Sequence, residues 1–368
     1  MHYSSVAQAP ALNGRTIALK HTPEALPVQT MELLTIEELK KVWTLSEPLD
    51  PGDPTLSATP LPLQRTFYPL GFPVTISTNS EQVMEAAELS LGCFEKLFSI
   101  KQIAISIGVT NGGSSTCPPA PVCRMRGHLL SNIADGENFA ISDFSEGFSL
   151  VWVNQATLEH ASYFRYFILE STAMGQIANR HAWGIHAACV DLDGAGLLLC
   201  GDSGAGKSTL SYGCARAGWT FVTDDGSYLV DGQDDRMIVG NCYLARFRPQ
   251  AERFFPELRG TGVTQHVDAS KPSIEFSTTA SRRVMTSQSS RVRHIVFLNR
   301  NTPDHELVTF PKEVARLYLL QRASSVPEQR RRQETMFEHL LGGGVFELRY
   351  TDLNWAITRL SRLVREGC

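Results

Sequence analysis

Residues 201–208 read Gly-Asp-Ser-Gly-Ala-Gly-Lys-Ser, which is the residue pattern of a loop that binds phosphate. Glycines allow the backbone to turn tightly and to bring its N–H groups close to an anion. The N-terminus of a helix that follows adds a partial positive charge. Lys207 can reach the β and γ phosphates of a nucleotide, and the Ser208 hydroxyl can bind Mg²⁺. We therefore predict a nucleotide site formed by Gly201, Asp202, Ser203, Gly204, Ala205, Gly206, Lys207, Ser208 and Thr209.

The sequence on each side of this loop predicts the elements that must position it. Residues 197–200 form a short apolar run, which is typical of a buried strand. Residues 208–217 have the pattern of a helix, and Gly218 provides a C-terminal cap. The alternative is a glycine-rich turn with an exposed lysine, but it explains neither the strand nor the capped helix. The order of strand, loop and helix therefore favours a nucleotide site.

Two adjacent carboxylates follow the next predicted strand, which spans residues 219–223. Asp224 and Asp225 come sixteen and seventeen residues after Ser208. One strand–loop–helix unit is expected to place this strand beside the loop's own strand, with its carboxyl end facing the phosphates. One carboxylate could then hold Mg²⁺, and the other could orient a hydroxyl nucleophile and accept its proton. A solvated Asp-Asp turn leading into Gly226 is the alternative.

His186 lies fifteen residues before Gly201, at the start of a predicted strand that pairs back toward the loop. An imidazole suits acid–base chemistry, and it equally suits a structural hydrogen bond in a packed core. The residue alone does not decide between these two roles.

Taken together, these residues resemble the catalytic domain of HPr kinase/phosphorylase and its related serine kinases. The order Gly184-Ile-His186, then the loop 201–208, then Arg216-Ala-Gly218, then Asp224-Asp225 follows the family pattern. The resemblance implies an α/β fold with a P-loop kinase core of the HPr kinase/phosphoenolpyruvate carboxykinase type. It implies ATP and Mg²⁺, with Lys207 binding the γ-phosphate and with Ser208 and Asp224 at the metal. It also implies that Asp225 is the catalytic base and that Asp224 and His186 support it.

The chain departs from the family pattern at two places. Thr209 stands where the family usually has glutamate after Lys-Ser. The later family signature Glu-x-Arg-Gly-Leu-Gly is absent, and residues 244–249 read Leu-Ala-Arg-Phe-Arg-Pro in that region. Arg246 or Arg248 could clamp a phosphate there, because a guanidinium matches phosphate oxygens bidentately. The resemblance therefore predicts a divergent member that acts on an acceptor other than HPr.

The overall composition is that of a soluble globular protein, with 42% hydrophobic and 20% charged residues. A net charge of −4 argues against a nucleic-acid partner or a membrane-surface role. The eight cysteines show no CxxC pairing, which fits a reducing compartment. There is no apolar run of 18 residues and no signal-peptide pattern at the N-terminus, so we expect a cytoplasmic protein.

The chain divides into three parts by composition and by the pattern of predicted elements. Residues 1–62 carry eight of the nineteen prolines, and they predict a proline-rich leader with a short helix that begins near Thr35. Residues 63–180 predict an α+β N-terminal domain, in which we find no catalytic motif. Residues 181–368 predict the HPr kinase-like P-loop catalytic domain.

These observations predict an ATP-dependent kinase, a phosphotransferase that moves the γ-phosphoryl group to a serine-type hydroxyl. The acceptor is a hydroxyl-bearing protein, peptide or small molecule, and a homo-oligomer is compatible with the sequence. A non-catalytic nucleotide-binding regulator is the first alternative. A phosphoenolpyruvate carboxykinase-like enzyme is the second, since that family combines Gly-Lys-Thr-Thr-Leu-Ser with a downstream Asp-Asp. We find neither the extra metal site nor the chain length that the carboxykinase requires.

Overall fold

The computed structural model describes residues 59–232, 236–261, 263–264, 273–278, 284–321, 323 and 327–367 of the chain. All of them belong to one compact unit, Pro48–Cys368. The short helix predicted in the proline-rich leader lies outside the described residues. The division of the chain into domains at residues 62 and 180 remains a prediction.

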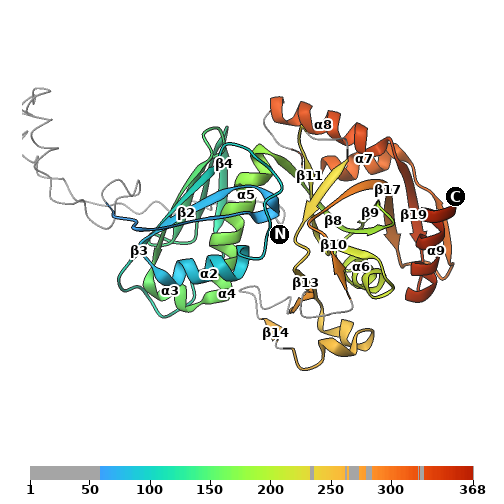
Figure 1. Ribbon diagram of the computed structural model, residues 1–368, viewed down its shortest axis with the longest axis horizontal. Helices are drawn as coiled ribbons and strands as arrows, with labels where there is room; N and C mark the ends of the chain where they lie inside the picture. Colours follow the sequence, from blue (N-terminus) through green and yellow to red (C-terminus); the bar gives the residue numbers. More distant parts are fainter. Residues whose placement is uncertain are drawn as a thin grey trace, which may run out of the picture. The chain divides into compact units, whose positions relative to one another are not determined.

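A seven-stranded sheet occupies the first part of the described chain (Figure 1). Its strand order is β1-β2-β3-β7-β6-β5-β4; the β2–β3 and β3–β7 pairs are parallel and the others antiparallel. Buried apolar side chains of α2, η2 and α5 pack with those of the strands into one core. The elements are β1 (Leu63–Phe67), η1 (Pro69–Gly71), β2 (Val74–Thr78), α2 (Glu81–Leu91), β3 (Ile103–Thr110), β4 (Val122–Arg126), β5 (Leu129–Ile133), β6 (Phe139–Asp143), β7 (Phe148–Asn154), α3 (Gln155–Glu159), α4 (Ala161–Tyr163), η2 (Phe164–Glu170) and α5 (Ser171–Arg180).

A nine-stranded sheet follows, with the order β16-β10-β8-β11-β12-β17-β19-β18 and with β9 paired to β8 and β17. A small sheet of β13, β15 and β14 accompanies it. The elements are β8 (Ala182–Leu192), β9 (Ala195–Cys200), α6 (Lys207–Arg216), β10 (Thr220–Thr223), β11 (Gly226–Val230), β12 (Met237–Gly240), β13 (Leu244–Phe247), η3 (Pro249–Arg253), η4 (Pro256–Leu258), β14 (Val263–Thr264), β15 (Ser273–Ser277), β16 (Met285–Thr286), β17 (Ser289–Asn299), β18 (Glu306–Thr309), α7 (Lys312–Leu320), α8 (Pro327–Leu341), β19 (Gly344–Arg349) and α9 (Leu353–Glu366).

Strand β9 is the buried centre of this second sheet, and every one of its residues is buried. It begins after a two-residue hairpin at Asp193 and Gly194, whose φ angles of 54° and 82° are those of a type I′ turn. Apolar residues of β9 and α6 share one core with α9. The sequence therefore places a rigid strand and a rigid helix on the two sides of residues 201–206.

The neighbour of β9 differs from the one that the sequence predicted. Strand β10 does not pair with β9; strand β8 lies between them and is antiparallel to both. The reason is that both edges of β9 are occupied: β8 pairs with one edge and β17 with the other, so β10 pairs with the far edge of β8 at Cys189–Asp191. Because β9 and β10 are both antiparallel to β8, their carboxyl ends still lie at the same edge of the sheet.

At the level of class, the prediction of an α/β fold is confirmed, because helices accompany sheets that contain both parallel and antiparallel pairs. The finer assignment to a P-loop kinase core remains a prediction.

Candidate nucleotide and phosphoryl-transfer site

The loop between β9 and α6 is shaped by its three glycines, which all have positive φ angles. The values are 151° for Gly201, 90° for Gly204 and 98° for Gly206. A side chain is strained at such angles, so glycine is required here by conformation. At Gly201 a Cβ atom would also lie 2.9 Å from the Cβ of Ala205. The far end of helix α6 closes as predicted, because Gly218 has a φ of 96° and its N–H donates to Ala215 O at 3.1 Å.

Lys207 is the first residue of α6, and its side chain is buried with only 5% exposed. Its Nζ donates to the carbonyl of Gly201 at 2.8 Å and to that of Asp202 at 3.3 Å. A third hydrogen bond of 2.9 Å joins Nζ to Nε2 of His186. Burial lowers the pKa of Lys207, and the nearby Asp225 carboxylate opposes that shift. The ammonium group is therefore held inside the loop by the loop's own carbonyls.

His186 connects this ammonium group to Asp225. Its Nδ1 lies 3.2 Å from Oδ1 of Asp225, and Lys207 Nζ lies 3.7 Å from the same oxygen. Since a protonated lysine can only donate to Nε2, the contacts assign the proton of a neutral imidazole to Nδ1, where it is donated to Asp225. The three residues that the sequence predicted from separate elements thus form one contiguous chain of polar contacts.

The two adjacent aspartates have opposite environments. Asp224 is buried, and its Oδ2 accepts the N–H of Arg246 at 2.9 Å. Burial and the charge of Asp225 raise the pKa of Asp224 to about 6, although the Arg246 N–H and a hydrogen bond with Ser208 oppose this shift. Burial also raises the pKa of Asp225, but His186 and Lys207 outweigh it and leave that pKa below its usual value.

Asp225 is half exposed, in contrast to its neighbour. An ionised and accessible carboxylate can accept a proton from an incoming hydroxyl, whereas a buried one is suited to hold a cation. Ser208 and Asp224, which were predicted at the metal, lie within hydrogen-bonding reach of each other. Within the described ranges, no group of three or more His, Cys, Asp or Glu residues could hold a metal ion.

Of the two arginines considered from the sequence, Arg246 is the one at the site. Its Nε lies 2.9 Å from Oε1 of Glu275, its Nη2 lies 3.7 Å from Oε2 of Glu170, and its guanidinium lies 4.9 Å from the ring centroid of Tyr166. Arg248 is exposed. The guanidinium of Arg246 is therefore paired with two carboxylates, while its backbone N–H holds Asp224.

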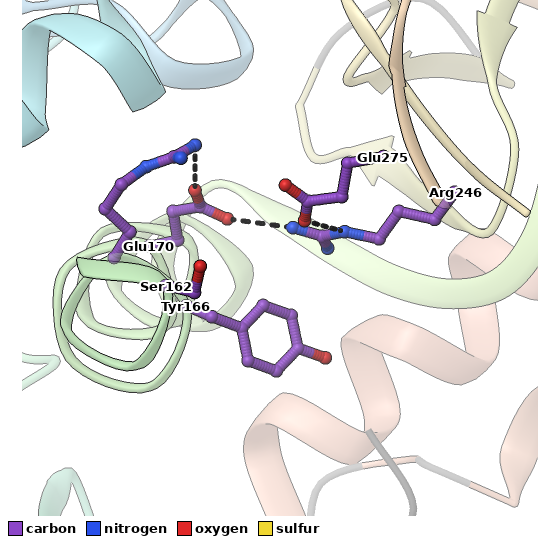
Figure 2. Close-up of a pocket in the computed structure, with 6 residues that line it drawn as sticks. Ser162, Tyr166, Glu170, Arg246 and Glu275 are labelled. Atoms are coloured by element: carbon purple, nitrogen blue, oxygen red, sulfur yellow. Dashed lines mark hydrogen bonds and ion pairs between the residues drawn. The ribbon is translucent and has the colours of Figure 1, made fainter. Parts of the chain in front are cut away.

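A small polar pocket opens beside Arg246 (Figure 2). Helix η2 and α4 contribute one wall, and the paired strands β13 and β15 contribute Arg246 and Glu275. Its lining residues are Ser162, Arg165, Tyr166, Glu170, Arg246 and Glu275. Helix η2 is a π-helix, a rare conformation that is frequently found at functional sites. The sequence motifs gave no indication of this pocket, because its residues come from three separate segments.

Three further residues lie against the loop and were not predicted from the sequence. The Tyr318 hydroxyl, from α7, donates to His186 O at 2.9 Å and accepts the Gly201 N–H at 3.3 Å. Arg300 and Tyr350 lie next to Gly206. Each follows or lies in an element far from the motifs, and no local pattern marks it.

Comparisons with known proteins agree with the resemblance seen in the sequence. No family model matches the chain. The HPr kinase/phosphorylase of Latilactobacillus sakei subsp. sakei (strain 23K) is 36% identical over 89 residues, which cover 24% of this chain and 26% of that relative. The HPr kinase/phosphorylase of Lachnoclostridium phytofermentans is 38% identical over 79 residues, which cover 22% of this chain and 23% of the relative. The chain spans about a quarter of the length of the curated relatives that it matches.

Among solved structures, the Hpr(Ser) kinase/phosphatase from Coxiella burnetii matches with 16% identity and a TM-score of 0.26; the match covers 50% of this chain and 99% of that chain. In class, the protein is a mixed α/β protein with a glycine-rich loop between a buried strand and a helix. Over about a quarter of its length, it is similar to curated HPr kinase/phosphorylases. In the described part of the chain, no helix is both long enough and apolar enough to span a membrane.

Proposed function

We propose that this chain is an ATP-dependent kinase that transfers the γ-phosphoryl group to a serine-type hydroxyl. The observation that carries the proposal is the contact chain from Lys207 through His186 to Asp225, beside the pair formed by Ser208 and Asp224. A cation for the phosphates, a base for the hydroxyl and a pair of oxygen ligands for a metal are the groups that phosphoryl transfer needs.

In this mechanism, loop N–H groups and Lys207 bind the phosphates, so that Lys207 exchanges its loop carbonyls for phosphate oxygens. Asp225 accepts the proton of the acceptor hydroxyl, and the acceptor oxygen forms its bond to the γ-phosphorus. The bond from that phosphorus to the β–γ bridging oxygen breaks, and ADP leaves with the electron pair. His186 orients Asp225 and keeps it ionised through the Nδ1 hydrogen bond.

The residues fit Mg²⁺, which prefers oxygen ligands, because a buried carboxylate and a hydroxyl stand together at the start of α6. Ser208 and Asp224 would hold the ion, and bound Mg²⁺ would neutralise charge that develops on the phosphates.

We further propose that the acceptor hydroxyl approaches Asp225 from the pocket of Figure 2. Arg246 supports this, because it lines the pocket with its side chain and holds Asp224 with its N–H. The curated relatives are named as kinases of HPr. Here we propose a different hydroxyl acceptor, a protein, peptide or small molecule, because Thr209 and residues 244–249 depart from the family pattern.

A cytoplasmic location fits the seven described cysteines, which are all free thiols.

The proposal is tested by incubating the protein with γ-labelled ATP and Mg²⁺ and a host lysate that has been split into protein and small-molecule fractions. Label in either fraction supports a kinase and identifies the acceptor class. Binding of ATP without transfer to any fraction would favour the non-catalytic regulator instead. Nucleotide turnover that depends on oxaloacetate would favour the carboxykinase.

A further inference from the structure

Arg300 is a cation beside the glycine loop, and it has no role in the mechanism proposed above. It directly follows β17, which runs parallel to β9 with Ile295 paired to Leu198 and Phe297 paired to Cys200. Carboxyl ends of neighbouring parallel strands meet at the same edge of a sheet. The residue after β17 therefore lies beside the loop that begins after β9.

The side chain of Arg300 lies directly against the last glycine of the loop. A Cβ atom at Gly206 would come within 3.3 Å of Arg300 Cδ, 3.4 Å of Arg300 Nη1 and 3.0 Å of the Tyr350 hydroxyl. Gly206 immediately precedes the N-terminus of α6, where backbone N–H groups and the helix dipole favour an anion. Arg300 thus adds a guanidinium to the end of the loop that is already positive.

The charge of Arg300 is uncompensated in the part of the chain that the structure describes, where no carboxylate lies within ion-pair distance of it. Its aromatic neighbour is Tyr350, with 5.8 Å between Arg300 Cζ and the ring centroid. Arg349, one residue before Tyr350, shows the contrast: it is paired with Glu306 at 3.3 Å and with Glu347 at 2.7 Å. Arg300 is also exposed, so its side chain is accessible to a ligand.

We infer that Arg300 binds the phosphates of the nucleotide that are not transferred, and this inference rests on the proposed function. Lys207 Nζ contacts His186 and lies near Asp225, where the transferred group must be. Arg300 contacts the other end of the loop, at Gly206, and can donate two N–H groups to phosphate oxygens. Because the phosphates that are not transferred are present in both nucleotides, Arg300 should contribute equally to the binding of ATP and of ADP.

The test measures the dissociation constants of ATP and ADP by calorimetry for the full-length wild type, Arg300→Ala, Arg300→Lys and Arg300→Gln. The expected result is affinity about tenfold weaker in Arg300→Ala for both nucleotides, the usual loss of one charge-assisted contact. Arg300→Lys keeps the charge and should bind more tightly than Arg300→Gln, which keeps only neutral hydrogen bonding. Arg365→Ala removes an exposed arginine paired with Asp193, and this control should bind like the wild type.

Several outcomes would overturn the inference. Affinity of Arg300→Ala within twofold of the wild type would show that the guanidinium does not bind the nucleotide. A loss for ATP alone would assign Arg300 to the transferred γ-phosphate. If Arg300→Gln bound nucleotide as well as or better than Arg300→Lys, Arg300 would be assigned to the nucleobase and not to the phosphates. A wild type that binds neither nucleotide would overturn this inference together with the proposed function, whereas the first three outcomes leave the proposed function standing.

Discussion

The nucleotide end and the acceptor end of the proposed site are built in different ways. The nucleotide end is built mainly on one continuous segment, the strand β9, the glycine loop and the helix α6, and the strand and the helix pack into a buried core. The acceptor end is a pocket whose walls come from η2, β13 and β15, which are far apart in the sequence (Figure 2). A continuous segment keeps its geometry through local backbone constraints. A pocket assembled from separate segments can change its specificity without disturbing phosphoryl transfer.

The two adjacent aspartates belong to different ends: we assign Asp224 to the nucleotide end and Asp225 to the acceptor end. Asp224 is buried and hydrogen-bonded to Ser208 and to the Arg246 N–H, and its pKa is raised to about 6. Asp225 is half exposed, and His186 and Lys207 hold its pKa below the usual value. Two carboxylates in such different environments are suited to different roles, as in other sites where the environment separates paired acids.

The largest effect should come from the nucleotide end. Lys207→Ala removes the only buried cation of the loop among the described residues, so we expect transfer to fall by about 10³-fold or more and ATP affinity to weaken about tenfold. Steady-state label transfer and calorimetry measure the two effects. Lys312→Ala, at an exposed position on α7, is the matched control. Normal transfer by Lys207→Ala would break the assignment of the whole nucleotide end.

His186→Ala should remove the contacts that join Lys207 at the nucleotide end to Asp225 at the acceptor end. Asp225 loses the hydrogen bond that lowers its pKa, so its pKa should rise and the acidic limb of the rate profile should move to higher pH. We expect kcat to fall by about 10²-fold at neutral pH, the usual range for assistance to a base. The measurement is kcat against pH for both proteins. A lower kcat with an unshifted profile would mean that His186 acts only through packing.

Asp224→Asn separates stability from activity. Because the pKa of Asp224 is raised by burial, ionisation disfavours the folded state, and stability falls as pH rises from about 4 to about 6 and is level above. An asparagine still accepts the Arg246 N–H without the charge. We expect the free energy of unfolding at pH 7 to rise by roughly 1–3 kcal/mol, with little change at pH 4, and we expect transfer to be lost.

Urea unfolding at the two pH values measures this effect, with Asp193→Asn in the exposed hairpin turn as the control. Equal stabilisation at pH 4 and pH 7 would show that the charge of Asp224 is not the cause.

The smallest effect should appear at the acceptor end. Glu170→Gln keeps the shape of the pocket but weakens the contacts of Glu170 with Arg246 and Arg165. We expect the acceptor KM to rise about fivefold with an unchanged ATP affinity, in line with the weakening of these two partly exposed ion pairs. Steady-state kinetics with the identified acceptor measure it. An equal change in ATP affinity would mean that the two ends are not separable.

The sequence predicted the parts of the molecule that depend on neighbouring residues. The buried strand before the loop, the helix after it and the cap at Gly218 all follow from local patterns, and the structure confirms them. The predicted position of β10 was wrong because β8 and the sequence-distant β17 occupy the two edges of β9, and no local pattern reveals the pairing with β17. Tyr318, Arg300 and the pocket around Arg246 were missed for the same reason, since tertiary packing alone brings them to the loop.

In the proposed mechanism, Asp225 takes the proton of an acceptor hydroxyl while Lys207 and its loop bind ATP. The most direct test measures label transfer from γ-labelled ATP and ATP binding in parallel, for the wild type and Asp225→Asn. We expect Asp225→Asn to bind ATP at least as tightly as the wild type and to transfer label at least about 10²-fold more slowly. Transfer by Asp225→Asn at the wild-type rate would contradict this mechanism.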